Sequence, residues 1–322
     1  MNTATTTPLR PEDFSRNSSS SQRLIGWSLI CAILSAAYAK PLLALMRHAW
    51  LSELYSYVVL VPLITIYFLW LKRKELLQGP VGSVSIAATL APVLPGVATL
   101  VAYWVAAIRG SKLGETDSLS LIIFSFVCFM IAGFLLCFGS KRLRTHAFPI
   151  GFLIFMVPFP TVVTNWFEVF LQHTSADAAS ALLSLSGATV FREGPYFHLP
   201  GIVIEVAKEC SGIHSTLVLF ITSLLAGHLF LRSPWKKAAL ALVVVPLGIA
   251  RNGFRIFTIS WLCVHVDPAM IDSPIHHRGG PIFFILSLVP FLAFLLVLRK
   301  SERPKNDPPA AIAVLPGKDT LT

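Results

Sequence analysis

The sequence contains few charged residues. Asp, Glu, Lys and Arg together make up 13% of its 322 residues, whereas a soluble domain has about 25%. Hydrophobic residues account for 55%, and the mean hydropathy is +0.71. A chain this apolar is neither a soluble globular protein nor a disordered one. Because its apolar runs are long and continuous, the pattern also argues against a transmembrane β-barrel and predicts an all-α polytopic membrane protein.

The sequence also lacks paired cysteines. The five cysteines form no C-x-x-C pair, and their odd number argues against a disulfide framework. No zinc site of that type is expected, and the histidines offer no clear three-ligand spacing, so neither a metal nor another cofactor is predicted. Four cysteines lie inside apolar runs, where they pack as small side chains. Cys210 differs, because polar and small residues surround it in the sequence. The cysteines are Cys31, Cys128, Cys137, Cys210 and Cys263.

The net charge of +10 arises from 26 basic residues against 16 acidic ones. A basic balance often indicates a nucleic-acid partner, but here the basic residues form short clusters between apolar runs. This placement is typical of loops on the cytoplasmic face of a membrane, where they contact anionic lipids. We therefore expect membrane lipids, and not nucleic acid, as a partner.

The long apolar runs predict about eight transmembrane helices of roughly 20 residues each. The fifth run contains Pro149, Pro158 and Pro160, so we expect it to be kinked or short. The approximate spans are 24–46, 54–71, 84–107, 118–138, 146–163, 212–231, 238–263 and 281–298.

The positions of Lys and Arg predict the orientation of these spans. The basic clusters after the second, fourth, sixth and eighth spans fall on one side, together with the N-terminal arginines. The positive-inside rule makes this side cytoplasmic. We therefore expect a multi-pass protein of the cell inner (plasma) membrane. Its parts would be a disordered cytoplasmic tail at 1–22, a transmembrane domain at 23–300 and a second disordered cytoplasmic tail at 301–322.

The opposite, extracytoplasmic face carries one long segment at roughly 161–211. Polar residues punctuate apolar ones from Val162 to Leu185, which predicts an amphipathic helix in the membrane interface. Gly187 is suited to end that helix. The turn-forming Glu193-Gly194-Pro195 lies between short β-prone stretches, so we expect an extended or hairpin excursion before Cys210.

Ionisable residues inside apolar spans are functional candidates, because burying them is costly. The seventh span holds Arg251, Asn252 and Arg255. The two arginines are four residues apart and share one helical face, with Arg255 about one turn nearer the outer surface. The alternative without function is an arginine that reaches for the interface or pairs with a carboxylate.

Two further candidates are expected on the outer side. Cys210, followed by Ser211 and Gly212, lies at or just before the start of the sixth span. There, a helix N-terminus and a nearby cation favour a thiolate. The loop before the eighth span contains His276 and His277, which exchange protons near neutral pH. Adjacent side chains point in different directions, so at most one of them faces a given site. An interfacial cysteine and solvated histidines are the alternatives.

A thiol, a guanidinium and an imidazole are thus expected at one membrane level. Cysteine and histidine form a nucleophile–base pair, and a cation beside them can stabilise a thiolate or a developing oxyanion. This favours an enzyme. Two other interpretations stay open. One is a multi-pass transporter that uses Arg251 and Arg255 to bind an anionic solute. The other is a membrane subunit for exopolysaccharide export with no chemistry of its own.

At these residues the chain resembles the exosortase/archaeosortase family of membrane cysteine transpeptidases. Cys210-Ser211-Gly212 matches the family's Cys-Ser-Gly element, and Asn252-Gly253-Phe254-Arg255 matches its Asn-x-x-Arg element. His276, with Gly280 four residues on, is similar to its histidine element. Two proline-containing apolar segments are similar as well, 56–64 and 155–160.

The resemblance covers roughly residues 50–290. The chain departs from the family pattern at His277, where an acidic residue is usual, and at Pro281, where tryptophan is usual. The choice between His276 and His277 as the matching histidine therefore stays open. Arg251 is an additional arginine beside the matched one, and these changes suggest a divergent subtype.

The resemblance implies a protein-sorting reaction. The partners would be exported proteins that end in a short motif such as Pro-Glu-Pro, a spanning helix and a basic tail. Cys210 would form a thioacyl intermediate and His276 would exchange the protons. Arg255 would stabilise the developing charge, with Asn252 orienting it. The sequence does not specify the acceptor nucleophile, nor the choice between transpeptidation and hydrolysis, and no cofactor is implied.

Overall fold

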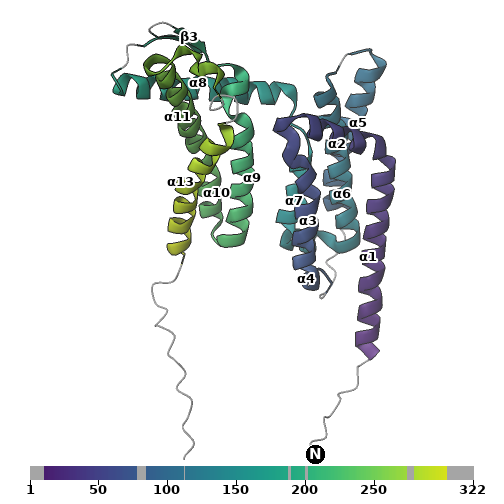
Figure 1. Ribbon diagram of the computed structural model, residues 1–322. Helices are drawn as coiled ribbons and strands as arrows, with labels where there is room; N and C mark the ends of the chain where they lie inside the picture. Colours follow the sequence, from purple (N-terminus) through teal and green to yellow (C-terminus); the bar gives the residue numbers. More distant parts are fainter. Residues whose placement is uncertain are drawn as a thin grey trace, which may run out of the picture. The chain divides into compact units, whose positions relative to one another are not determined.

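The computed structural model describes residues 11–77, 85–111, 113–187, 190–199, 202–273 and 279–302. The chain divides into two compact units, Met1–Glu168 and Val169–Thr322, whose helices are drawn in Figure 1. The first helix begins at Pro11. Residues 11–22 of the first expected tail belong to this helix. Residues 1–10 and 303–322 lie outside the described residues, so their disorder stays a prediction.

The described residues include six helices that are long and apolar enough to cross a membrane. They coincide with six of the predicted spans, which confirms a helical multi-pass membrane fold. The two remaining predicted spans are bent pairs of helices, so the total is six to eight. The six helices are Glu53–Leu71, Ile86–Ile108, Glu115–Thr145, Ile213–Phe230, Pro234–His265 and Gly280–Lys300.

The first predicted span, 24–46, is not one straight helix. It consists of two segments bent by 74° at Tyr38. Pro41 gives the physical reason, because it has no N–H to donate to the carbonyl of Ala37 and its ring displaces that carbonyl. The sequence pattern of apolar residues runs through this point unchanged, so periodicity alone did not reveal the bend.

The first unit contains the N-terminal helices, and α5 and α6 form its closest pair. A Cβ atom on Gly96 would lie 2.9 Å from Cβ of Cys128, so the backbones approach as closely as glycine allows. Its elements are α1 (Pro11–Ala37), α2 (Ala39–Leu51), η1 (Glu53–Val59), α3 (Leu60–Leu71), α4 (Arg73–Leu77), α5 (Ile86–Ile108), α6 (Glu115–Thr145), α7 (Ala147–Phe152) and η2 (Leu153–Met156).

The fifth predicted span is broken, as its prolines indicated. Ala147–Met156 and Thr161–Leu185 meet at 90°. Side chains from α6 hold the link between them: Ser120 Oγ donates to the carbonyl of Pro158 (2.7 Å). The carboxylate of Asp117 accepts from N and Oγ1 of Thr161 (2.7 Å each). This carboxylate therefore satisfies the first N–H of the helix that follows, α8 (Thr161–Leu185).

The second unit has a small sheet at one end of its spanning helices (Figure 1). A helix covers the segment that was predicted to be amphipathic: α8, which Gly187 ends with a φ of +79°. Its position in the membrane interface stays a prediction. The predicted hairpin is confirmed as β1 and β2, and a third strand, β3, was not predicted. The elements after α8 are β1 (Phe191–Glu193), β2 (Tyr196–Leu199), β3 (Ile202–Glu205), η3 (Lys208–Ser211), α9 (Ile213–Phe230), α10 (Pro234–Leu242), α11 (Val244–His265), η4 (Pro268–Asp272) and α13 (Gly280–Lys300).

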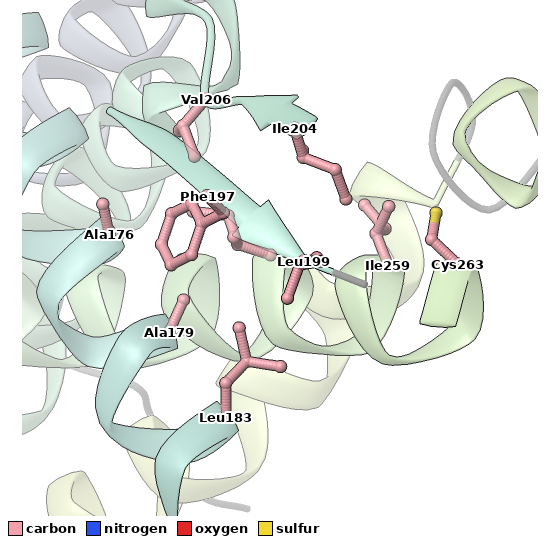
Figure 2. Close-up of a cluster of buried hydrophobic side chains, with 10 residues drawn as sticks. Ala176, Ala179, Leu183, Phe197, Leu199, Ile204, Val206, Ile259 and Cys263 are labelled. Atoms are coloured by element: carbon pink, nitrogen blue, oxygen red, sulfur yellow. The ribbon is translucent and has the colours of Figure 1, made fainter. Parts of the chain in front are cut away.

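The sheet packs on α8 and α11 through one apolar face. Phe197, Leu199 and Ile204 are buried and point away from the exposed side of the sheet. Figure 2 shows them between Ala179 on α8 and Ile259 on α11. The alternation of buried and exposed residues along β2 is what a strand with one covered face requires. The sheet is thereby fixed to the two helices that flank Cys210 in the structure.

Small residues fix how α11 packs against its neighbours. A Cβ atom on Gly248 would lie 2.6 Å from Oγ1 of Thr216 on α9, and one on Gly253 would lie 2.6 Å from Cβ of Ala178 on α8. Helices in a membrane approach this closely only where a small side chain leaves room. Both the rotation and the height of α11 relative to α8 and α9 are therefore set by these two contacts.

The other end of the second unit carries a polar clamp. The carboxylate of Glu302 accepts from the backbone N of Arg232 and of Ser233 (2.9 Å each), which precede α10. These two hydrogen bonds, that of Arg232 first, hold the pKa of the Glu302 carboxyl below its usual value. Lys236 Nζ donates to Ser301 Oγ (2.8 Å) just beyond α13. The clamp and the sheet are separated by α9, which is about 27 Å long at 1.5 Å per residue.

We expect Gly253→Ala to lower the free energy of unfolding by about 1–3 kcal/mol, because its methyl group would overlap Ala178. The measurement is chemical unfolding of the purified protein in detergent. Gly151→Ala is the control: Gly151 is helical with no atom near its would-be Cβ, so this change should be neutral or stabilising by up to about 1 kcal/mol. Adding Ala178→Gly should make Gly253→Ala less costly in a double-mutant cycle. Unchanged stability of Gly253→Ala would contradict the packing described.

Candidate functional site

Cys210 lies in a tight turn between the sheet and α9. The short helix η3 carries it, and its backbone N donates to the carbonyl of Ala207 (2.9 Å). Gly212 follows with a φ of +76°, a conformation that glycine adopts without strain. It lets the chain enter α9 at Ile213. The cysteine is half-buried and lies immediately before a long helix, as the sequence indicated.

Two consecutive residues of α11 hold this turn. Asn252 Nδ2 donates to the carbonyl of Cys210 (2.9 Å). Arg251 Nη2 donates to the carbonyl of Gly212 (3.1 Å) and to Thr216 Oγ1 (3.3 Å). Arg251 and Asn252 are only 8% and 2% exposed. The backbone on both sides of Ser211 is therefore tied to one point on α11.

The same contacts explain why residue 212 is glycine. A Cβ atom at this position would lie 2.9 Å from Arg251 Nη2 and 3.1 Å from Asn252 Oδ1. Its positive φ and this close approach both exclude a larger side chain. Burying a guanidinium costs several kcal/mol unless its N–H groups find acceptors. Here Nη2 has a carbonyl and a hydroxyl as acceptors, whereas Nη1 is buried without a hydrogen-bond partner among the described residues. Through Nη2, Arg251 joins α11 to the turn and to α9.

A side chain from α8 holds the segment that leads into the turn. Gln172 Nε2 donates to the carbonyl of Val206. Val206 lies opposite Pro195, and its N–H donates to the Pro195 carbonyl (3.0 Å). Because proline has no N–H, Pro195 cannot donate to the Val206 carbonyl. The pairing of β2 with β3 therefore leaves this carbonyl without a donor. The amide of Gln172, which is 6% exposed, supplies that donor.

A pocket opens beside Cys210 within the second unit. Its volume is about 40 Å³, counted as space open to the centres of water molecules; this is room for a few waters at roughly 10–15 Å³ each. One side is polar and the other is made of branched aliphatic side chains. The lining residues are Ile204, Glu205, Val206, Cys210, Asn252, Arg255, Ile256, Ile259, Ser260 and Ile271.

The two arginines of α11 differ in surroundings. Arg255 lines the pocket together with Cys210. Arg251 lies one helical turn earlier on α11 and donates hydrogen bonds to Gly212 and Thr216 instead. The side chain of Asn252 contacts the backbone of the cysteine itself, a contact that the sequence did not predict. The idea that Asn252 orients Arg255 stays a prediction. The structure thus brings Cys210, Asn252 and Arg255 together at one pocket.

His276 and His277 lie outside the described residues, so their role stays a prediction. The segment that contains them joins η4 to α13 in the sequence. Ile271, in η4, is a pocket residue, and it lies five positions before His276. Within the described part of the chain, no three His, Cys, Asp or Glu side chains gather closely enough to hold one metal ion.

Several residues around the pocket escaped the sequence analysis. Gln172 is one of many polar residues on an amphipathic helix, and its position there gave no sign that it would meet Val206. Glu205 ends a strand that was not predicted. Ser260 lies on α11 five positions after Arg255, about 140° around the helix at 100° per residue, so its spacing from Arg255 gave no signal. Ser211 and Ser260 are buried, and their hydroxyls have no hydrogen-bond partner among the described residues.

Comparison with known proteins provides one match. Residues 50–310 match the family described as transmembrane exosortase. The match spans more than half of the chain and includes every described residue of the pocket. Among curated proteins and solved structures, nothing matches the chain.

Proposed function

Because the chain belongs to the transmembrane exosortase family, we propose that it cleaves C-terminal sorting signals of exported proteins as a membrane-embedded cysteine transpeptidase or protease. Family membership itself implies a membrane protein that processes sorting signals. The observation that carries the finer proposal is the pocket in which Cys210 and Arg255 face the same small space. A nucleophile beside a fixed cation is the minimum that acyl transfer through a thioester requires.

The reaction has two steps. The thiolate of Cys210 attacks the scissile carbonyl, and the oxyanion that forms is stabilised by the guanidinium of Arg255. The helix and basic tail leave as a free amine, with a proton from His276 or from His277 in its place, while the new carboxyl end of the exported protein stays on sulfur as a thioester. An acceptor nucleophile, or water, then loses its proton to the histidine, attacks the thioester and releases Cys210.

The turn around Cys210 holds the nucleophile in place. Cys210 lies three residues before the first residue of α9 and lines the pocket with Arg255. The Asn252 bond to the Cys210 carbonyl fixes the backbone of the nucleophile. A nucleophile that is held before the substrate arrives loses little freedom on reaching the transition state.

The geometry disfavours a transporter that binds its solute with both arginines. The Nη2 group of Arg251 already donates to the Gly212 carbonyl and to Thr216. Arg255 is therefore the arginine that lines the pocket. The pocket has room for only a few waters, and half of its ten lining residues are isoleucine or valine. Burying Arg251 and Asn252 beside the Cys210 turn is costly. In an export subunit without chemistry of its own, this turn would have no function that explains the cost.

The orientation in the membrane is also part of the proposal. The pocket lies at one end of α9, and Arg232, Lys236 and Lys237 lie at or beyond its other end. The positive-inside rule then puts the basic end in the cytoplasm and the pocket on the extracytoplasmic side. A substrate helix held in the bilayer would present its juxtamembrane motif at the depth of Cys210, which raises the effective concentration of the motif.

Cys210→Ser should abolish processing of a tailed reporter while the protein stays in the membrane, because an alcohol at this position is a far weaker nucleophile than a thiolate. Processing is measured as the rate of tail loss at matched enzyme abundance. The same change at Cys31, Cys128, Cys137 or Cys263 should leave the rate within about twofold. A Cys210→Ser enzyme that processes tails at the normal rate would show that Cys210 is not the nucleophile.

Arg255→Lys should reduce turnover at least about a hundredfold, the order expected when one oxyanion donor is lost. Lysine keeps the charge but lacks the planar pair of donors. Arg251→Lys should act mainly on stability, because Arg251 bonds to the Gly212 carbonyl. Turnover and unfolding temperature are measured for both variants. The roles would be reversed if Arg251→Lys were inactive and Arg255→Lys were active at equal stability.

Topology is testable by labelling. In a cysteine-free background, His198→Cys should react with an impermeant maleimide in intact cells, because His198 is exposed and on the same end as the pocket. Lys300→Cys, at the basic end, should react only after lysis. The opposite pattern would invert the orientation and separate the pocket from exported substrates.

A further inference from the structure

The sheet of the second unit has an open side. Its strand order is β1-β2-β3, so β3 pairs with β2 on one side and is an edge strand on the other. Within the described part of the chain, no strand pairs with β3 on that outer side. An edge strand presents a row of backbone N–H and C=O groups that can pair with another extended segment.

The register shows which groups face outward. The N–H of Val206 donates to the carbonyl of Pro195, and the pairing of β2 with β3 is antiparallel throughout. Because hydrogen-bonded pairs alternate along an antiparallel ladder, residues 202, 204 and 206 turn their N–H and C=O groups toward β2. Val203 and Glu205 therefore turn theirs toward the open side.

That open side borders the pocket. Ile204, Glu205 and Val206 all line it. Side chains of consecutive strand residues point to opposite faces, so three consecutive residues meet one pocket only where the edge of the strand itself forms its wall. No residue of β2 is among the lining residues. The outward groups of Glu205 therefore lie along the pocket that contains Cys210.

The rest of the pocket is suited to one peptide side chain. Ile256, Ile259 and Ile271 provide apolar walls. The hydroxyl of Ser260 is fully buried, lines the pocket and has no hydrogen-bond partner among the described residues. A buried hydroxyl without a partner is unfavourable, and a ligand with a backbone amide or a polar atom at this depth would provide the missing partner.

We propose that the sorting signal binds as an additional strand along the outer edge of β3, in an extended conformation. This inference rests on the proposed function and specifies how that site takes its substrate. The N–H and C=O groups of Val203 and Glu205 pair with alternate residues of the signal, and one side chain enters the pocket toward Ser260. Main-chain pairing gives affinity and the pocket gives specificity, as in other cases of strand addition.

The length and chemistry of the edge define the ligand. Four residues of β3 span about 13 Å at 3.3 Å per residue, which matches a peptide motif of about four residues. Only every second residue of the signal needs an N–H. A motif such as Pro-Glu-Pro meets this condition, because its glutamate supplies both groups while the prolines fall at positions that face away from β3. The strand leads through Val206 to η3, so a peptide that follows it is delivered to Cys210.

The first test changes the substrate alone. A synthetic tail with a Pro-Glu-Pro motif, an apolar helix and a basic end is prepared in versions that replace one backbone N–H at a time by an ester oxygen. The bond that is cut is left unchanged. In lipid nanodiscs, kcat/KM should fall at least about tenfold for the ester at the glutamate and at non-proline positions two residues away from it. It should fall less than about twofold at non-proline positions three residues away. An effect without this alternation overturns the inference while the proposed function stands. If the wild-type enzyme does not cut the unmodified tail, both fail.

The second test changes the enzyme. Glu205→Pro removes an outward N–H that takes no part in the pairing with β2, whereas Glu205→Ala keeps it. Glu205→Pro should process the tail at least about tenfold more slowly than Glu205→Ala. The matched control is Arg192 on β1, whose N–H faces outward at the opposite edge of the same sheet by the same alternation. Arg192→Pro and Arg192→Ala should differ by less than about twofold. Equal rates for the two Glu205 variants would overturn the inference. If Glu205→Pro lowers the unfolding temperature, the ester series decides.

Discussion

The bonds from Arg251 and Asn252 to the backbone around Cys210 are the contacts on which the rest of the pocket depends. They join the turn that carries the thiol to the helix that carries Arg255. The buried guanidinium donates from Nη2 to a carbonyl and a hydroxyl oxygen, which lowers the cost of its burial. The Cys210 carbonyl gains a donor in the amide of Asn252. Gly212 makes the arrangement possible, since any side chain there would collide with both donors. The height of Arg255 follows from this connection.

A membrane protein confines such polar networks to places where lipid does not reach them. The second unit does this at both ends of its helices. At one end, the sheet covers α8 and α11 with an apolar face, and the pocket opens beside it. At the other, Glu302 and Lys236 tie the end of α13 to the start of α10. Between the two ends, contact is apolar and close, with Gly248 as the small residue at the α9–α11 crossing. Rigid packing in the middle keeps the pocket end in shape.

The membrane fold was predictable from the sequence because lipid imposes a local rule. A helix that crosses it needs about 20 apolar residues whatever its neighbours are, and six spans appeared where such runs lie. The helix α8 and the β1–β2 hairpin were predictable for similar reasons, from amphipathic spacing and from Gly194-Pro195. The bend at Tyr38 was missed, since one proline interrupts an apolar pattern without changing it. The catalytic role of His276 or His277 remains a prediction from the family resemblance.

The sequence by itself determined that this is a multi-pass helical protein of the exosortase family with Cys210 at the start of a span, because composition, apolar runs and short motifs are local properties. Only the tertiary structure decided the partners of those residues. Arg251 and Asn252 are adjacent on α11 to Gly253, whose contact with α8 sets the rotation of the helix. That rotation turns Arg251 and Asn252 toward the turn and Arg255 toward the pocket. The open edge of β3 also depends on the tertiary structure. Its four residues form a strand only when β2 pairs with them and the helices cover one face of the sheet.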